Sequence, residues 1–319
     1  MATAWDELTS RSCNGTMLHT RRFISYHGDR FTDRSMVVVN ESERIVGVFP
    51  AADDPAAQQT LTSHPGLSYG GLVHDGSLRG NSMIATIGGL AARYLDLGFT
   101  TLRYKSIPAI YHVEPADDDT YALFRLGAVL YRRDLSATID LANRGRVSQR
   151  RRRSRLRAEK EGVKLRESWA DVGEYWQILT SNLQRRHGVA PVHSFAEIEL
   201  LHSRFPDEIF LITAEHQGDL VGGAVFFASR SVLHMQYSAT TEAGRELFST
   251  DLFMERGIDI AAERGLRYFD FGVSMLSGGR GLDDQLYAFK IAFGAGGLTQ
   301  DYYELDLRMA SERGRNAGN

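Results

Sequence analysis

The sequence contains one cysteine, Cys13, among 319 residues. A single cysteine excludes an internal disulfide framework and a metal site built from several cysteines. No apolar run approaches the roughly 20 residues that a membrane-spanning helix requires. The first residues, Met1–Glu7, also lack the basic start and apolar stretch of a signal peptide. We therefore expect a cytoplasmic protein without membrane insertion and without a bound metal.

An excess of charge of either sign is also absent. The chain has 37 Lys and Arg against 40 Asp and Glu, a net charge of −3, so we expect no general attraction to nucleic acid or to anionic membranes. One local exception is the run Arg150–Arg157, with arginine at six of its eight positions. Two interpretations stay open: a solvated basic helix, or an anion site in which guanidinium groups bind phosphate oxygens.

The first pattern that is present is an internal repeat. Residues 36–50 and 209–227 both have two β-branched or apolar runs around a polar turn, which predicts a hairpin in each half. Each predicted hairpin precedes a helix that ends near a glycine, Gly98 or Gly265, and then a short strand. The offset between these glycines is 265 − 98 = 167 residues. A period this long predicts two similar domains rather than a solenoid, and we expect them at 1–138 and 139–319.

The second half predicts its elements clearly. An arginine-rich helix is followed by a strand at about 163–167, a helix at 171–187 that stops at Gly188, and a short helix whose capping box begins at Ser194. Three strands at 209–215, 220–228 and 231–239 lead through a loop at 240–249 into a helix at 250–264. A strand, a helix at 283–293 and a last strand at 299–306 complete the predicted order. The predicted fold class is therefore α/β, with an α+β type of mixed sheet.

This order of elements resembles the GNAT superfamily of acyl-CoA-dependent N-acyltransferases. The whole chain resembles the Fem-like branch, in which two GNAT-like domains pack side by side. The segments that carry the likeness are 23–31, 63–72, 105–112, 186–194, 268–274 and 289–295. That branch includes bridge-forming peptidoglycan aminoacyltransferases and smaller N-acyltransferases of surface polysaccharide biosynthesis. The bridge-forming enzymes often carry a helical coiled arm, for which this sequence shows no long heptad stretch.

The resemblance implies that the C-terminal domain binds acetyl-CoA or another acyl-CoA as co-substrate. In the GNAT fold the fourth strand ends at a helix whose N-terminal amides hold the cofactor pyrophosphate, as free N–H groups and the helix dipole favour an anion. Here the segment lacks the usual glycine-rich signature of the superfamily. Only Gly244 and Arg245 match that signature. The expected cofactor-binding residues are Ala239, Thr240, Thr241, Gly244, Arg245, Glu246 and Leu247.

Three side chains are candidates for catalysis. Lys290 matches the lysine that Fem-like transferases place near the transfer site, and the apolar positions around it predict that it lies on the exposed side of its helix. His193 lies in a loop and has the side-chain type that accepts a proton near neutral pH. Asp270 lies between aromatic residues and must find a polar partner or face a cleft.

The acceptor site is expected from polar aromatic and basic residues, which can both stack on a sugar or nucleotide and hydrogen-bond to it. The candidates are His64, Tyr69, Tyr104, Lys105, Tyr111, His112, Arg186, His187, Arg150 and Arg153. Each of these residues also fits an ordinary packing or surface role.

The sequence thus predicts an acyl-CoA-dependent N-acyltransferase that acts by direct transfer in a ternary complex. Its expected partner is a small-molecule amine, an amino sugar or nucleotide-linked amino sugar. Two alternatives stay open: an aminoacyltransferase that uses charged transfer RNA on a peptidoglycan precursor, and a catalytically degenerate protein that binds acyl-CoA or a nucleotide. A homodimer is compatible with the sequence, which does not fix the oligomeric state.

Overall fold

A computed structural model describes residues 1–276 and 279–317, which form two compact units. Unit 1 comprises Met1–Asp134 together with the C-terminal residues from Thr299, and unit 2 comprises Leu135–Leu298. The sequence division at 138/139 lies close to the first crossing between the units. It differs at the C-terminus, because the residues from Thr299 pack with unit 1 rather than with unit 2.

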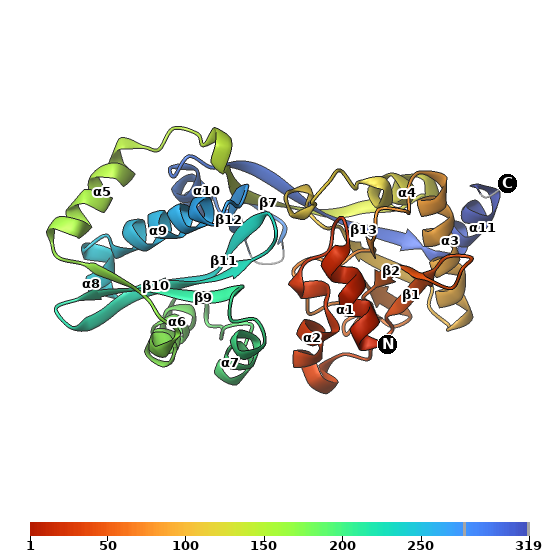
Figure 1. The fold of residues 1–319 in the computed structure, drawn as a ribbon, viewed down its shortest axis with the longest axis horizontal. Helices are drawn as coiled ribbons and strands as arrows, with labels where there is room; N and C mark the ends of the chain where they lie inside the picture. Colours follow the sequence, from red (N-terminus) through yellow and green to blue (C-terminus); the bar gives the residue numbers. More distant parts are fainter. Residues whose placement is uncertain (277–278, 318–319) are drawn as a thin grey trace. The chain divides into compact units, whose positions relative to one another are not determined.

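Unit 1 combines a small sheet, a second set of strands and a group of helices (Figure 1). The small sheet has the order β1-β2-β5, and the other strands have the order β3-β4-β6-β13. Helices α3 and α11 pack so closely that a Cβ atom on Gly88 would lie 2.7 Å from the Cα of Gly314. The strands are β1 Met36–Val39, β2 Ile45–Phe49, β3 Ala52–Asp53, β4 Thr60–Thr62, β5 Val73–His74, β6 Thr101–Lys105 and β13 Gly296–Asp306, and the helices are α1 Ala2–Arg11, α2 Arg21–Ile24, α3 Asn81–Asp96, α4 Asp118–Leu126 and α11 Leu307–Ala317.

Unit 2 is a single mixed sheet with helices on both faces. Its strand order is β7-β12-β11-β10-β9-β8, and Figure 1 shows α5, α9 and α10 on one face of it and α6 and α7 on the other. The strands are β7 Val129–Asp140, which enters unit 2 at Leu135, β8 Lys164–Glu167, β9 Ile209–His216, β10 Asp219–Ala228, β11 Val232–Thr240 and β12 Tyr268–Val273. The helices are α5 Gln149–Lys160, α6 Val172–His187, α7 Phe195–Arg204, α8 Glu242–Glu246, α9 Ser249–Glu263 and α10 Asp284–Ile291.

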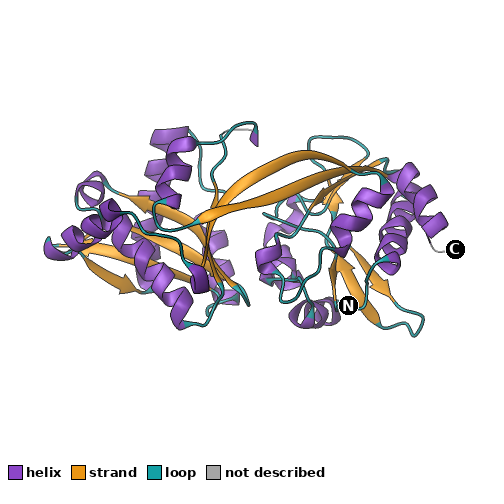
Figure 2. Ribbon diagram, turned by 90° about the horizontal axis from the view of Figure 1, so that it is seen from above, coloured by secondary structure: helices purple, strands orange, loops and turns teal. Residues whose placement is uncertain are grey.

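The predicted repeat is confirmed element by element. Hairpin β1–β2 corresponds to β9–β10, α3 to α9, β6 to β12 and α4 to α10. The strands that follow the two repeats are long, at 12 residues for β7 and 11 for β13 (Figure 2). Each completes the sheet of the other repeat, because β7 pairs with β12 and β13 pairs with β6. This exchange is why the C-terminal strand belongs to unit 1.

The local signals at the helix ends of unit 2 also behave as predicted. Helix α6 ends at Gly188 in the left-handed conformation, and Ser194 and Glu197 form the capping box of α7. The predicted loop 240–249 is wrong in part, because it contains the five-residue helix α8 and α9 already begins at Ser249. In the described ranges no helix is long and apolar enough to cross a lipid bilayer.

Candidate active site

A cavity opens in unit 2 where strands β11 and β12 diverge. The two strands pair in parallel over three positions, ending with His234 opposite Asp270. Beyond this pair β11 continues to Thr240 with only β10 as its neighbour. The cavity has a volume of about 570 Å³ and is lined by the later part of β11 and by Phe271 of β12, together with residues of α5, α6, α9 and α10. The interruption of the sheet therefore creates a pocket with exposed strand edge along one wall.

The lining of this cavity is cationic on some walls and apolar on others. Its apolar wall residues are Leu179, Leu183, Met235, Ala239, Phe248, Phe253, Met254, Phe271, Leu286 and Phe289. Its charged lining residues are five cations, Arg150, Arg151, Arg186, Arg245 and Lys290, and one carboxylate, Asp251. An excess of positive charge in a partly enclosed pocket favours an anionic ligand, while the apolar walls favour an aliphatic portion of the same ligand.

Lys290 lines the cavity but is not on the exposed side of α10 as the sequence pattern predicted. Its exposed fraction is only 4%, and its ammonium group donates to the carbonyl oxygens of Gly272 and Val273, each at 2.9 Å. Burial lowers the pKa of Lys290 to about 8, although Asp270 and Asp283 act in the opposite direction. Because an ammonium group has three donors, one N–H remains for a ligand.

Helix α9 presents its N-terminus to the cavity, and a carboxylate already occupies it. Asp251, in the first turn, accepts from Nη1 of Arg151 at 2.8 and 2.9 Å, and both side chains are buried. The guanidinium group of Arg151 also lies over the rings of Phe289 and Phe293, at 4.2 and 5.2 Å. Its buried Nε has no hydrogen-bond partner, so Arg151 keeps one donor that a ligand could satisfy.

The predicted cofactor segment divides into two groups. Ala239, Thr240 and Arg245 line the cavity. The others lie outside its lining: Thr241 caps α8, Gly244 packs against β10, Glu246 is exposed, and Leu247 packs against the hydrophobic core. A Cβ atom on Gly244 would lie 2.1 Å from the carbonyl oxygen of Val221, so close packing accounts for this glycine.

Asp270 has a histidine partner that the sequence did not single out. Its carboxylate lies 2.9 Å from Nδ1 of His234 and accepts from the hydroxyls of Ser136 and Thr138 and from the amide of Gly272. Burial raises the pKa of Asp270, but the bonds from His234, Ser136 and Gly272 outweigh it and lower the pKa to about 2. Asp270 is therefore held as an anion beside an imidazole.

The remaining candidates of unit 2 occupy different positions. Nδ1 of His193 lies 2.7 Å from the hydroxyl of Tyr237, and His193 does not line the cavity. Arg150 and Arg186 line it, whereas Arg153 is exposed on α5 outside it. The side chain of His187 lies outside the described part of the chain.

The acceptor candidates of unit 1 lie within its packing. Tyr104 donates to Asp119 at 2.5 Å, and Tyr69 donates to Thr16. Lys105 donates to three backbone carbonyl oxygens, those of His64, Pro65 and Leu67. The side chains of Tyr69, Tyr104, Tyr111 and His64 are buried.

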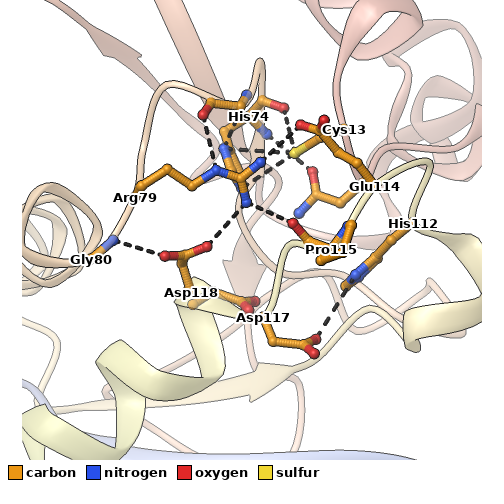
Figure 3. A network of polar contacts seen from close by, with 12 residues as sticks. Cys13, His74, Arg79, Gly80, His112, Glu114, Pro115, Asp117 and Asp118 are labelled. Carbon is orange, nitrogen blue, oxygen red and sulfur yellow. Dashed lines mark hydrogen bonds and ion pairs between the residues drawn. The ribbon is translucent and has the colours of Figure 1, made fainter.

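His112 lies beside the polar network of unit 1 drawn in Figure 3. It interacts with the carbonyl oxygen of Ile107 and lies 3.9 Å from a carboxylate oxygen of Asp117. Next to it, Arg79 binds Asp118, which accepts from the amide of Gly80, so the network ties α3 to α4. Cys13 is buried in the same region with its sulfur 3.5 Å from Nε2 of His74, which fits a structural role.

Sequence reasoning missed two residues that line the cavity, Arg151 and Asp251, and it also missed His234, the partner of Asp270. One signal was available for Arg151, because Ser154 and Ala158 place small residues three and seven positions later on the same helix face. That face is buried, and a small-residue stripe predicts close helix packing. Among the described residues, no group of three or more His, Cys, Asp or Glu is placed to hold a metal ion.

Comparison with known families identifies one domain of the chain. Residues 143–286 match the model of the acetyltransferase (GNAT) domain. The chain therefore contains a GNAT domain, and this domain supports an acyltransferase. The matched region begins just after β7 and ends in the first turn of α10, so it contains the cavity lining except Phe289 and Lys290. No curated protein sequence matches the chain.

Solved structures extend the likeness in fold over both units. FemX aligns with a TM-score of 0.69 at 12% identity, covering 96% of each chain. The C-terminal domain of a putative lysylphosphatidylglycerol synthetase from Agrobacterium fabrum aligns with a TM-score of 0.63 at 11% identity, covering 99% of this chain and 96% of that one. L-PGS from Bacillus licheniformis aligns at 0.61 and 13%, covering 92% and 90%. The Fem-like GNAT fold expected from the sequence is thus confirmed.

Proposed function

We propose that this GNAT-type acyltransferase uses an acyl-CoA as donor and transfers the acyl group to a primary amine. The observation that carries the proposal is the cavity between the diverging strands β11 and β12, with strand edge, cations and apolar surface on its walls. An acyl-CoA has three corresponding parts: an amide-containing arm, phosphates and an acyl chain.

The unpaired edge of β11 is a suitable place for the thioester of the acyl-CoA. Beyond His234, β11 keeps β10 as its neighbour, and the side facing β12 is unpaired in the register of the two strands. A bulge places Gln236 between the pairs Val225–Tyr237 and Phe226–Met235. Bulges reorient backbone groups near active sites, and a backbone N–H directed at a thioester oxygen stabilises the developing oxyanion by roughly 3–4 kcal/mol. We place the reacting carbonyl beside this bulge.

The arginines of the cavity wall are suitable partners for the phosphates of the acyl-CoA. Arg150, Arg186 and Arg245 line the cavity and form no ion pair within 4 Å of a carboxylate among the described residues, although the charge of Arg150 acts on Asp251. Guanidinium groups bind phosphate oxygens in a bidentate manner. We assign the phosphates to these three side chains. The GNAT resemblance favours the start of a helix as the pyrophosphate site. At the start of α9 the carboxylate of Asp251 makes this place less favourable for a second anion.

The acceptor in this proposal is an amino sugar, free or linked to a nucleotide. The support for this class is the resemblance to N-acyltransferases of polysaccharide biosynthesis rather than a built sugar site. The α6 face of the sheet offers polar groups beside the bulge, the pairs His193–Tyr237 and His234–Asp270.

A second candidate donor is an aminoacyl-transfer RNA. Asp251 at the start of α9 disfavours a pyrophosphate there. Arg150, Arg152 and Arg153 of α5 are exposed. Such a surface fits a phosphate backbone. This donor also presents an ester carbonyl to the same bulge.

An assay with each donor in turn separates the two candidates. Acetyl-CoA or an aminoacyl-transfer RNA would be incubated with glucosamine and the purified protein, and acyl transfer would be followed by mass spectrometry. Our proposal predicts an acylated amine and free coenzyme A thiol from acetyl-CoA, unaffected by ribonuclease. Transfer that requires intact transfer RNA and falls steeply with salt would instead establish the second candidate.

A further inference from the structure

His234 and Asp270 stand at the point where the sheet of unit 2 opens. They form the last pair between β11 and β12, and the bulge at Gln236 follows two residues later. His234 lies opposite Phe227, and Gly223 on the same face of β10 contacts Tyr175 of α6. Because side chains alternate along a strand, the imidazole lies on the α6 face. The neighbouring cavity residue Met235 lies on the other face.

The surroundings of Asp270 fix the protonation pattern of the imidazole. Asp270 is an anion with only acceptor atoms, so the 2.9 Å contact requires Nδ1 of His234 to carry the hydrogen. In a neutral imidazole the other nitrogen, Nε2, then has the lone pair. Gly272 lies close to the ring, since a Cβ atom there would be 3.2 Å from Cε1 of His234. The side chain of His234 keeps an exposed fraction of 22% and is therefore reachable.

The other polar groups near the opening are less suited to accept a proton. Asp270 is held by its hydrogen bonds as a very weak base. Lys290 has two of its N–H groups bound to backbone carbonyl oxygens. His193 contacts the hydroxyl of Tyr237 through Nδ1 and is almost fully buried.

We propose that His234 is the general base of the acyl transfer and that Asp270 positions it. This inference rests on the proposed N-acyltransferase function. The amine nitrogen forms a bond to the thioester carbonyl carbon, and the carbon–sulfur bond breaks with its electron pair on sulfur. One proton of the attacking nitrogen moves to Nε2 of His234. It reaches the thiolate through solvent, so the products are an amide and a free thiol.

The kinetic test compares two acceptors in the parent protein and in His234→Gln. Glucosamine is largely protonated at neutral pH, whereas hydroxylamine is not and needs less help from a base. With glucosamine and acetyl-CoA, we expect His234→Gln to lower kcat by about 100-fold or more, and with hydroxylamine by much less. Acetyl-CoA affinity should stay unchanged, and the matched control His216→Gln, on the rim of the same sheet, should keep parent kinetics.

A second measurement does not depend on turnover. In ¹⁵N-histidine-labelled protein, the imidazole signal missing from His234→Gln should show the Nδ1–H tautomer, and Asp270→Asn should change it. An Nε2–H tautomer, an equal loss with both acceptors, or an active His234→Gln would overturn the assignment of His234 while leaving the N-acyltransferase function standing. A parent protein that releases no thiol from any acyl-CoA would instead overturn the proposed function.

Discussion

Replacing Lys290 by methionine removes a buried ammonium group while keeping most of the side-chain volume. The pKa of Lys290 falls from 10.5 to about 8 because burial disfavours the charged form. One pKa unit corresponds to about 1.4 kcal/mol, so the difference amounts to about 3 kcal/mol between the two protonation states. The unfolded chain keeps the ordinary pKa of lysine.

The pH dependence follows from these two pKa values. Between about pH 8 and pH 10.5 the unfolded chain binds the proton that folded Lys290 has lost, so the free energy of unfolding rises with pH across this window. Below pH 8 both states carry the proton and the contribution is constant. Lys290→Met has no such group. The stability of the parent relative to this variant should therefore increase by about 3 kcal/mol from pH 8 to pH 10.5.

Urea unfolding followed by circular dichroism, at half-unit steps from pH 7 to pH 10.5, measures this difference. All other titrating groups, including the buried Lys105, are common to both proteins and cancel. The exposed Lys164→Met variant controls for the loss of a lysine as such. A parent-minus-variant difference that stays flat, or that falls with rising pH, would refute the buried position of Lys290.

Three further predictions test the site and its surroundings. Asp251→Asn should lower the free energy of unfolding by about 3 kcal/mol, because Arg151 loses its counter-charge. Coenzyme A should then stabilise this variant more than it stabilises the parent. Equal stabilisation of the two proteins would argue against an α9 N-terminus blocked by Asp251. Arg150→Ala should weaken coenzyme A binding in calorimetry by about tenfold, while Arg153→Ala should not, and the reverse order would misplace the phosphates. Tyr104→Phe should cost about 1–3 kcal/mol in thermal unfolding and leave kcat/KM near the parent value; a selective loss of acceptor affinity would return Tyr104 to the acceptor site.

The sequence predicted the fold well because its signals are local and repeated. The hairpin within 209–227, the capping box at Ser194 and the helix stop at Gly188 each depend on neighbouring residues, and all three lie where expected. The C-terminal strand β13 was assigned to the wrong unit because strand pairing is a long-range choice. Its partner β6 lies about 200 residues earlier in the chain.

The site was harder to predict because the hydrogen-bond partner and the burial of each side chain determine its role. Asp270 was identified as a charged residue that needs a partner, but nothing in the sequence indicates that His234, 36 residues earlier, supplies it. The polar aromatics of unit 1 and a cofactor residue such as Gly244 have the residue types of a binding site. In the structure Tyr104 and Gly244 contribute to packing instead. Residue type alone does not separate a ligand contact from a satisfied buried group.

Hydrogen exchange followed by mass spectrometry, with and without saturating acetyl-CoA, tests the central claim most directly. The claim is that the cavity of unit 2 between β11 and β12 holds the acyl donor. We predict slower exchange in peptides covering 235–240 of β11 and 248–254 at the start of α9, both of which line the cavity. Slower exchange confined to peptides of unit 1, or no change at saturating acetyl-CoA, would contradict it.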